Sequence, residues 1–181
     1  LIEALQKDLV GIVSIVPEAA SILYRGGFPR RSSATGKKHA QRAICFVQRE
    51  LEDLITLENK VQAIICDRGS LDSIAYWPGD EADFFKSMHT TKEQELERYQ
   101  WVLHLDTTTN ISFDTNNPVR IESHKEAVEL NDLVRSAWAG HSKRIIIPHN
   151  DNFLEKISKA KKAIQMILAG KSYNEVLTFI S

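Results

Sequence analysis

The sequence predicts an α/β protein built on a parallel sheet with helices on both faces. Two observations support this fold class. Short, continuously apolar segments alternate with longer segments of helical periodicity, as βαβ units require. The apolar segments also lack an alternation of polar and apolar residues, so both faces of the sheet are expected to be buried. The expected strands cover residues 13–16, 61–66, 102–105 and 144–147.

Length and composition indicate one ordinary domain over residues 1–181, with 171–181 as a short C-terminal helical extension. The 181 residues are 43% hydrophobic, and the net charge of −1 gives no broad field toward nucleic acid or membrane. No apolar run approaches the roughly 20 residues of a membrane span, and no signal peptide is visible. The two cysteines form no CxxC pair, and the six histidines lack the spacing of a zinc site. We expect a cytoplasmic protein that binds neither nucleic acid nor membrane.

In the first half of the chain, apolar patterns and turn residues predict where each strand and helix lies. An apolar stripe at helical spacing opens the chain, and Pro17 and Glu18 end the first strand. A polar, basic loop is expected over residues 26–38, where glycine and serine interrupt the apolar pattern. The helices expected around the first two strands cover about residues 1–9, 19–24, 39–57 and 71–76.

In the second half, capping signals mark where helices begin. A capping box places Ser or Thr three residues before Glu or Gln, so that each side chain bonds to the other residue's backbone N–H. The pairs with this spacing are Thr90 with Glu93, Ser123 with Glu126, and Ser172 with Glu175. The expected helices cover about residues 82–88, 90–99, 123–139 and 152–169, with a short terminal helix after Ser172.

Charged residues stand where the first two strands end. Glu18 follows the first strand, and Asp67 and Arg68 follow the second. Ligands bind beyond the carboxyl ends of parallel strands, so these side chains are expected on one edge, around a pocket. A carboxylate there could hold Mg²⁺ or act as a general base, and a guanidinium could clamp a phosphate. The same residues also fit a charged turn with a capped helix.

Two further features bear on phosphate binding. Gly36 and Lys37 do not form a Walker A motif. That motif needs glycine at position 31, which is Arg31, and Ser or Thr at position 38, which is Lys38. This loop fits either a basic rim around an anionic ligand or a solvated loop. Arg120 stands just before a helix N-terminus, where anions bind, or else forms a surface ion pair.

Taken in order, these segments resemble the P-loop kinase-like ATPases, small AAA-type ATP-binding proteins close to nucleoside and nucleotide kinases. The resemblance extends to about residue 169 and rests on residues 15–20, the helix with Gln41 and Gln48, residues 65–76 and residues 117–123. In that family a strand and a Gly-rich Walker A loop precede the first helix. The resemblance therefore implies a three-layer P-loop NTPase-like sheet whose N-terminal strand and P-loop precede Leu1.

The resemblance also implies roles at the strand ends. Asp67 matches a Walker-B-like carboxylate near Mg²⁺, and Arg68 matches an arginine on the acceptor side. Glu18 stands where nucleoside kinases place the carboxylate that activates the acceptor hydroxyl. These matches imply a phosphotransferase that moves the γ-phosphate of ATP to a small hydroxylated or phosphorylated acceptor, for instance a nucleoside-like molecule. The alternative is a regulatory ATP- or GTP-binding NTPase or switch protein, which has no need for the base at Glu18.

Other positions take roles only through the resemblance. Gln41 and Gln48 would line the acceptor pocket, and Arg120 would meet the transferred phosphate in the lid segment. His149 and Asn150 would border the adenine. The expected partners are therefore a nucleotide and a small-molecule acceptor.

Overall fold

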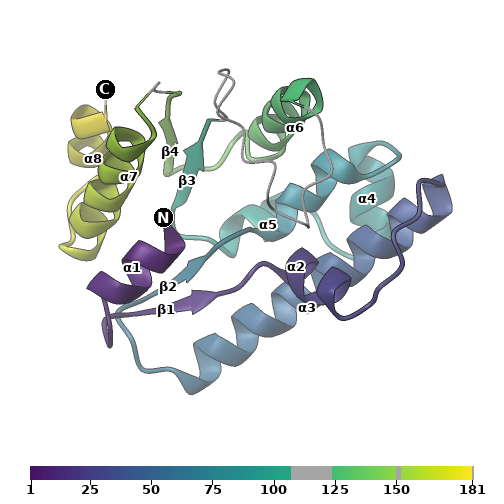
Figure 1. Cartoon of the computed structure of the whole chain (residues 1–181), viewed down its shortest axis with the longest axis horizontal. Coiled ribbons are helices and arrows are strands. Elements are labelled where there is room, and N and C mark those ends of the chain that lie inside the picture. Colours follow the sequence, from purple (N-terminus) through teal and green to yellow (C-terminus); the bar gives the residue numbers. More distant parts are fainter. Residues whose placement is uncertain (107–123, 150–151, 181) are drawn as a thin grey trace. The chain divides into compact units, whose positions relative to one another are not determined.

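The computed structural model describes residues 1–106, 124–149 and 152–180, which form two compact units (Figure 1). Unit 1 contains Leu1–Asp8 and the chain from Tyr99 onward, and unit 2 contains Leu9–Arg98. Each unit has its own two-stranded parallel sheet. The organisation of residues 1–181 as a single domain stays a prediction.

The sheet of unit 2 joins two strands that are far apart in the sequence. β1 (Val13–Val16) pairs in parallel with β2 (Ala63–Cys66), and Val16 lies opposite Cys66. The strand β2 begins later than the expected residue 61, because the chain bends at Gln62 before entering the ladder. The parallel pairing requires a crossover, and two helices supply it (Figure 1).

Helices make up most of unit 2. The long helix α3 packs against both strands and against its neighbouring helices. It begins before the expected residue 39, because Ser33 is its N-cap and accepts a hydrogen bond from the Gly36 N–H at 3.1 Å. The segment after β2 is a 3₁₀-helix, η1. The helical elements are α2 (Ala19–Arg25), α3 (Ala34–Glu58), η1 (Ser70–Tyr76), α4 (Glu81–Met88) and α5 (Lys92–Glu97).

The capping box of α5 lies one residue further along than the sequence suggested. The Thr91 hydroxyl accepts a hydrogen bond from the Gln94 N–H at 3.3 Å, and Gln94 Oε1 accepts one from the Thr91 N–H at 3.1 Å. The expected pair of Thr90 with Glu93 is therefore wrong. Thr90 donates instead to the Glu95 carboxylate at 2.7 Å, a contact that no local spacing predicts.

Unit 2 has a compact aromatic cluster at its core. Trp77 and Phe84 meet edge to face with ring centroids 5.4 Å apart. Cys45 of α3 and Met88 of α4 complete the buried cluster. The Trp77 indole N–H donates to Asp83 at 2.9 Å, so its one polar atom has a partner.

The sheet of unit 1 is formed by β3 (Val102–Leu105) and β4 (Arg144–Ile147), again in parallel. Glu175 Oε2 accepts a hydrogen bond from the Ser172 N–H at 2.9 Å, and Ser172 Oγ accepts one from the Glu175 N–H at 3.4 Å, which confirms this capping box. The helices of this unit are α1 (Ile2–Asp8), α6 (His124–Ala137), α7 (Phe153–Leu168) and α8 (Tyr173–Ile180).

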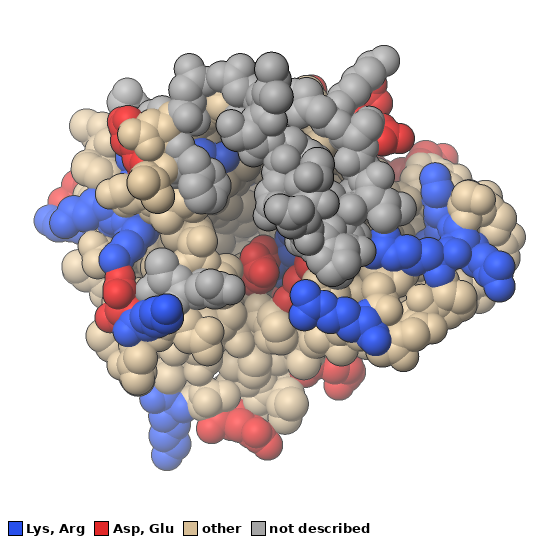
Figure 2. All heavy atoms as spheres, in the orientation of Figure 1, with Lys and Arg blue, Asp and Glu red and all other residues tan. Residues whose placement is uncertain are grey.

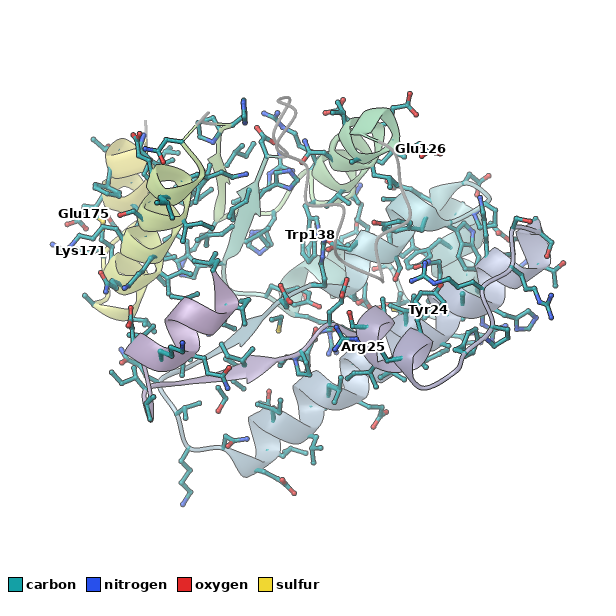
Figure 3. All side chains as sticks on the ribbon, viewed as in Figure 1. Tyr24, Arg25, Glu126, Trp138, Lys171 and Glu175 are labelled. Atoms are coloured by element: carbon teal, nitrogen blue, oxygen red, sulfur yellow. The ribbon has the colours of Figure 1, made fainter. Side chains whose placement is uncertain are left out.

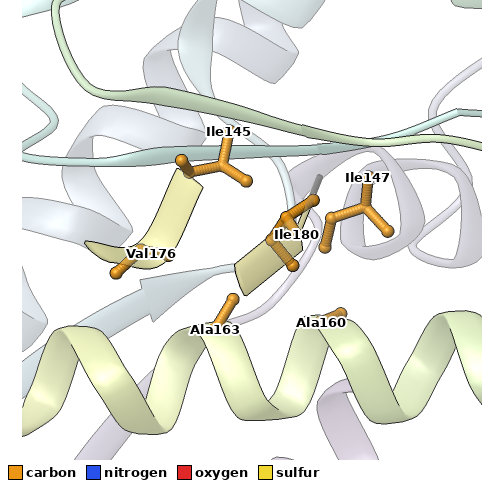
Figure 4. Close-up of a cluster of buried hydrophobic side chains, with 6 residues drawn as sticks. All are labelled: Ile145, Ile147, Ala160, Ala163, Val176 and Ile180. Atoms are coloured by element: carbon orange, nitrogen blue, oxygen red, sulfur yellow. The ribbon is translucent and has the colours of Figure 1, made fainter. Parts of the chain in front are cut away.

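The core of unit 1 lies where β4, α7 and α8 meet (Figure 4). Small residues on α7 permit close packing against the branched side chains of the strand. Because α8 contributes two buried side chains, the C-terminal segment is part of the hydrophobic core. The buried members are Ile145, Ile147, Ala160, Ala163, Val176 and Ile180.

The described strands thus pair in parallel, as an α/β fold requires, but they form two small sheets. The expected single sheet is not seen among the described residues, and the three-layer arrangement stays a prediction. In the parts of the chain that the structure describes, no helix combines the length and apolar character of a membrane span.

Candidate functional site

The register of β1 and β2 brings the two strand-end segments together. Val16 and Cys66 are the last paired residues, and the Asp67 N–H donates to the Val16 carbonyl at 3.1 Å. Because the strands are parallel and end level, the chain leaves both at the same edge. Glu18 and Arg68 consequently emerge as neighbours, on the edge where ligands bind in parallel sheets.

Glu18 directly precedes α2, and its carboxylate has two neighbours. The Ser21 hydroxyl donates to Glu18 Oε2 at 2.5 Å, and Glu18 Oε1 lies 3.9 Å from Arg68 Nε. The Glu18 side chain makes no capping hydrogen bond to the helix. With 32% of its surface exposed, the carboxylate is oriented by protein groups and still open to a ligand.

Arg68 is held between two carboxylates from different elements. Its Nη1 donates to Asp72 Oδ2 of η1 at 3.3 Å, and its Nε faces Glu18. The charge of Asp72 and, to a lesser degree, that of Glu18 raise the pKa of Arg68. The Arg68 side chain is 45% exposed, which leaves it accessible to a ligand.

Asp67 stands beside this pair with an exposed carboxylate. Local desolvation raises the pKa of Asp67, the Arg68 charge opposes the rise, and Glu18 and Asp72 add to it. Within the residues that the structure describes, no hydrogen bond to this carboxylate is found. A cation bound here would relieve the repulsion among the carboxylates.

Gln48 is a buried link between α2 and α3. Its Oε1 accepts from the Ala19 N–H at 3.4 Å, and its Nε2 donates to Glu52 at 3.0 Å. Both ends of the amide thus have protein partners. Gln41 is also buried and lies two turns earlier on the same face of α3. The placement of these two residues in an acceptor pocket stays a prediction.

The other predicted site residues lie elsewhere. His149 follows β4 in unit 1 and is partly buried. Arg120 and Asn150 lie outside the described residues, so their roles at the phosphate and the adenine stay predictions, as does that of His149.

Several residues around the site were not anticipated from the sequence. Asp72 and Ser21 contact the predicted residues, and their spacings of four from Arg68 and three from Glu18 are the only local signals. The Glu95 carboxylate gives no such signal, because its partner Arg49 is 46 residues away in the sequence.

A second polar cluster surrounds Asp106, at the end of β3 in unit 1. His104 Nε2 lies 3.3 Å from Asp106 Oδ1, and the Asn131 amide donates to the same oxygen at 3.3 Å. Arg135 faces the other carboxylate oxygen at 3.6 Å. The ammonium of the buried Lys156 donates to the Asp106 carbonyl, and burial lowers the pKa of Lys156.

The donors at the edge of unit 2 fit magnesium better than a closed metal site. No group of three or more His, Cys, Asp or Glu suited to a metal ion occurs among the described residues. Magnesium commonly takes only one or two carboxylates from the protein and completes its shell with water and substrate phosphates. Asp67, exposed beside Glu18, is a suitable ligand of this kind.

One protein family matches most of the chain. The family described as an AAA domain matches residues 1–156. The chain belongs to this family. The AAA domain is accordingly a nucleotide-binding P-loop protein, and the family generally binds ATP with Mg²⁺. Comparison with curated proteins and with solved structures found no match.

Proposed function

We propose that this AAA domain is an ATP-dependent phosphotransferase that moves the γ-phosphate of ATP to a small hydroxylated acceptor. The observation that carries the proposal is the meeting of Glu18 and Arg68, whose Oε1 and Nε are 3.9 Å apart at the ligand-binding edge of a parallel strand pair. An acceptor needs a base for its hydroxyl and a cation for its charge, and this edge offers both.

Glu18 is the proposed general base. Ser21 occupies Oε2, which leaves Oε1 to take the proton of the acceptor hydroxyl. As the acceptor oxygen forms its bond to the γ-phosphorus, the bond from that phosphorus to the bridging oxygen breaks and ADP leaves. The catalytic contribution of the chain is therefore mainly positioning and charge neutralisation.

Arg68 and Asp67 are proposed to act on the phosphate side. Arg68 would neutralise charge on the transferred group with its exposed donors, while Asp72 fixes the direction of its side chain. Asp67 would hold Mg²⁺, which neutralises phosphate charge when bound. An ionised Asp67 is required for this role, and the bound cation would favour ionisation against the desolvation that raises its pKa.

The proposal is tested with two isosteric variants, Glu18→Gln and Asp67→Asn, in the full-length protein. Glu18→Gln should lower acceptor-dependent ADP formation by about 100-fold or more, and ATP affinity should persist. Asp67→Asn should remove most phosphoryl transfer and most ATP hydrolysis, and the protein should stay folded. The assay measures ATP affinity and ADP release with a panel of nucleosides and sugars.

Matched controls make the same chemical changes at exposed positions. The control variants are Glu58→Gln, at the C-terminal end of α3, and Asp132→Asn, on α6. Both controls should behave like the wild type. If Glu18→Gln leaves turnover intact while Asp67→Asn abolishes it, the regulatory NTPase or switch function replaces the phosphotransferase.

A further inference from the structure

The charge of unit 2 is unevenly distributed along the chain. The segment Ala19–Arg49 contains seven of the 23 Lys and Arg residues and none of the 24 Asp and Glu residues. We call it the acid-free segment. The remainder of the chain therefore carries 16 basic against 24 acidic residues, so the acid-free segment is strongly basic within a nearly neutral protein. Figure 2 shows Lys and Arg side chains gathered over the end of unit 2 where α2 stops and α3 begins.

Two of these seven cations are neutralised within unit 2. Lys38 pairs with Asp83 at 2.5 Å, and Arg49 pairs with the buried Glu95. Arg30 stacks on the Tyr24 ring, with its guanidinium carbon 3.8 Å from the ring centroid. The remaining four are exposed, and the described part of the chain supplies no carboxylate partner for any of them: Arg25, Arg31, Lys37 and Arg42.

The acid-free segment begins at the residue directly after Glu18, the proposed catalytic base. Ala19 follows Glu18 directly, and its N–H contacts Gln48 of α3 at 3.4 Å. From this contact Arg25 lies six residues along α2, and Arg42 lies six residues back along α3. Each is therefore about 9 Å from the contact, measured along its helix axis.

Both arginines lie on the same side of that contact. The short connection over residues 26–33 joins the end of α2 to the start of α3 (Figure 1). From the contact between Ala19 and Gln48, α2 runs forward and α3 runs back toward this connection. Figure 3 labels Tyr24 and Arg25 at the end of α2. The backbone positions of Arg25 and Arg42 thus lie within a small molecule's length of this contact, and neither side chain has a carboxylate partner among the described residues.

We propose that the acceptor is a phosphorylated small molecule and that Arg25 and Arg42 bind its phosphate. This inference rests on the proposed phosphotransferase function. Arginine offers planar, bidentate donors that match a phosphate, and its charge persists at every working pH. A phosphate anchored on these arginines would hold the acceptor hydroxyl at Glu18, so the acid-free segment determines which acceptor is used.

The test compares acceptors that differ only in a phosphate. ADP formation is measured with nucleosides against their 5′-monophosphates, and with ribose against ribose 5-phosphate. The phosphorylated member should have a kcat/KM at least 100-fold higher. Arg25→Gln and Arg42→Gln should each lower that preference by 10-fold or more, mainly through KM, and leave ATP affinity unchanged. The preference should also fall as salt is raised.

Two lysines provide the control, Lys37 in the first turn of α3 and Lys60 just beyond its C-terminal end. Lys37→Gln and Lys60→Gln make the same change at exposed positions near opposite ends of α3. Lys37→Gln should weaken the preference modestly, since it lies further from Glu18 than Arg42 does. Lys60→Gln should leave it unchanged.

The outcomes separate this inference from the function on which it rests. Equal turnover of both members of each pair, or arginine variants with an unchanged preference, refutes the phosphate site and leaves the phosphotransferase standing. Hydrolysis of ATP without transfer to any acceptor refutes both. Binding of a single-stranded oligonucleotide that the same variants abolish, without a preference among small acceptors, assigns the segment to nucleic acid and overturns the inference.

Discussion

Replacing Glu95 with glutamine tests the polar network that fastens α5 to the remainder of unit 2. The Glu95 side chain is 3% exposed, and its carboxylate accepts hydrogen bonds from α3, from η1 and from the segment that precedes α5. Arg49 of α3 and Thr90 donate to Oε1, and Ser70 of η1 donates to Oε2 at 2.6 Å. The substitution keeps the size of the side chain and removes its charge, so it isolates the electrostatic part of the network.

The expected loss follows from the burial of this pair. Hydrogen bonds to a charged group contribute about 1.5–3 kcal/mol, and breaking a buried ion pair costs about 3–5 kcal/mol. Glutamine retains one acceptor oxygen, which recovers part of this cost. We expect the free energy of unfolding at pH 7 to fall by about 2–4 kcal/mol. For a chain of this size that corresponds to a drop in Tm of roughly 4–16 °C.

The pH dependence gives the loss a distinct signature. Burial acts to raise the pKa of Glu95, but hydrogen bonds from Ser70 and Thr90 and the charge of Arg49 outweigh it, so the pKa lies below its usual value. The ionised carboxylate therefore stabilises the fold fully above the unfolded pKa of about 4.3. This contribution is lost as the pH falls through the lower, folded pKa.

Urea unfolding between pH 3 and 7, followed by circular dichroism, measures both quantities. The stability gap between wild type and Glu95→Gln should be complete at pH 7 and narrow in the acid range. Glu97→Gln on the same helix is exposed and should show little change. A gap under about 1 kcal/mol at pH 7, or one that stays constant down to pH 3, would refute the reasoning.

Two further predictions concern the interior of unit 2. Burial raises the pKa of both Cys45 and Cys66 to about 12. Native protein at pH 8 should therefore react with a thiolate-specific reagent at least 100-fold more slowly than protein unfolded in urea. Rapid labelling of either thiol in the native state would contradict this. Phe84→Ala should lower the free energy of unfolding by about 3–5 kcal/mol in urea titrations, since Phe84 is 1% exposed. Phe46→Ala should lower it far less, because that side chain is 41% exposed. Equal losses would show that the Trp77 cluster is not a core.

Local sequence patterns predicted the strands well. The predicted segments 13–16, 102–105 and 144–147 coincide with β1, β3 and β4, because each is as long as a buried strand and a proline or aspartate follows it. Asn152, at the start of its predicted helix, caps α7 by accepting hydrogen bonds from Leu154 and Glu155. Periodicity and capping act within a few residues, so a single sequence contains them.

The candidate site was predictable only in part. Glu18 and Arg68 could be identified because a parallel sheet places its strand ends on one edge. The contact of Gln48 with Ala19 could not, since it depends on how α2 packs on α3. Similarly, nothing in the sequence distinguishes Thr90 from Thr91 as the N-cap. Glu95 decides this by binding the Thr90 hydroxyl from inside the fold.

The Glu95 network also affects how this chain emerges during synthesis. Arg49 leaves the ribosome 46 residues before Glu95, and Glu52 leaves 46 residues before Arg98. At about 5–20 residues per second, the delay is roughly 2–9 s. During that interval α3 presents charges that are buried in the finished unit, and water must solvate them. Unit 2 can therefore complete its polar network only once α5 has been made, because Glu95 and Arg98 are among the last residues of the unit.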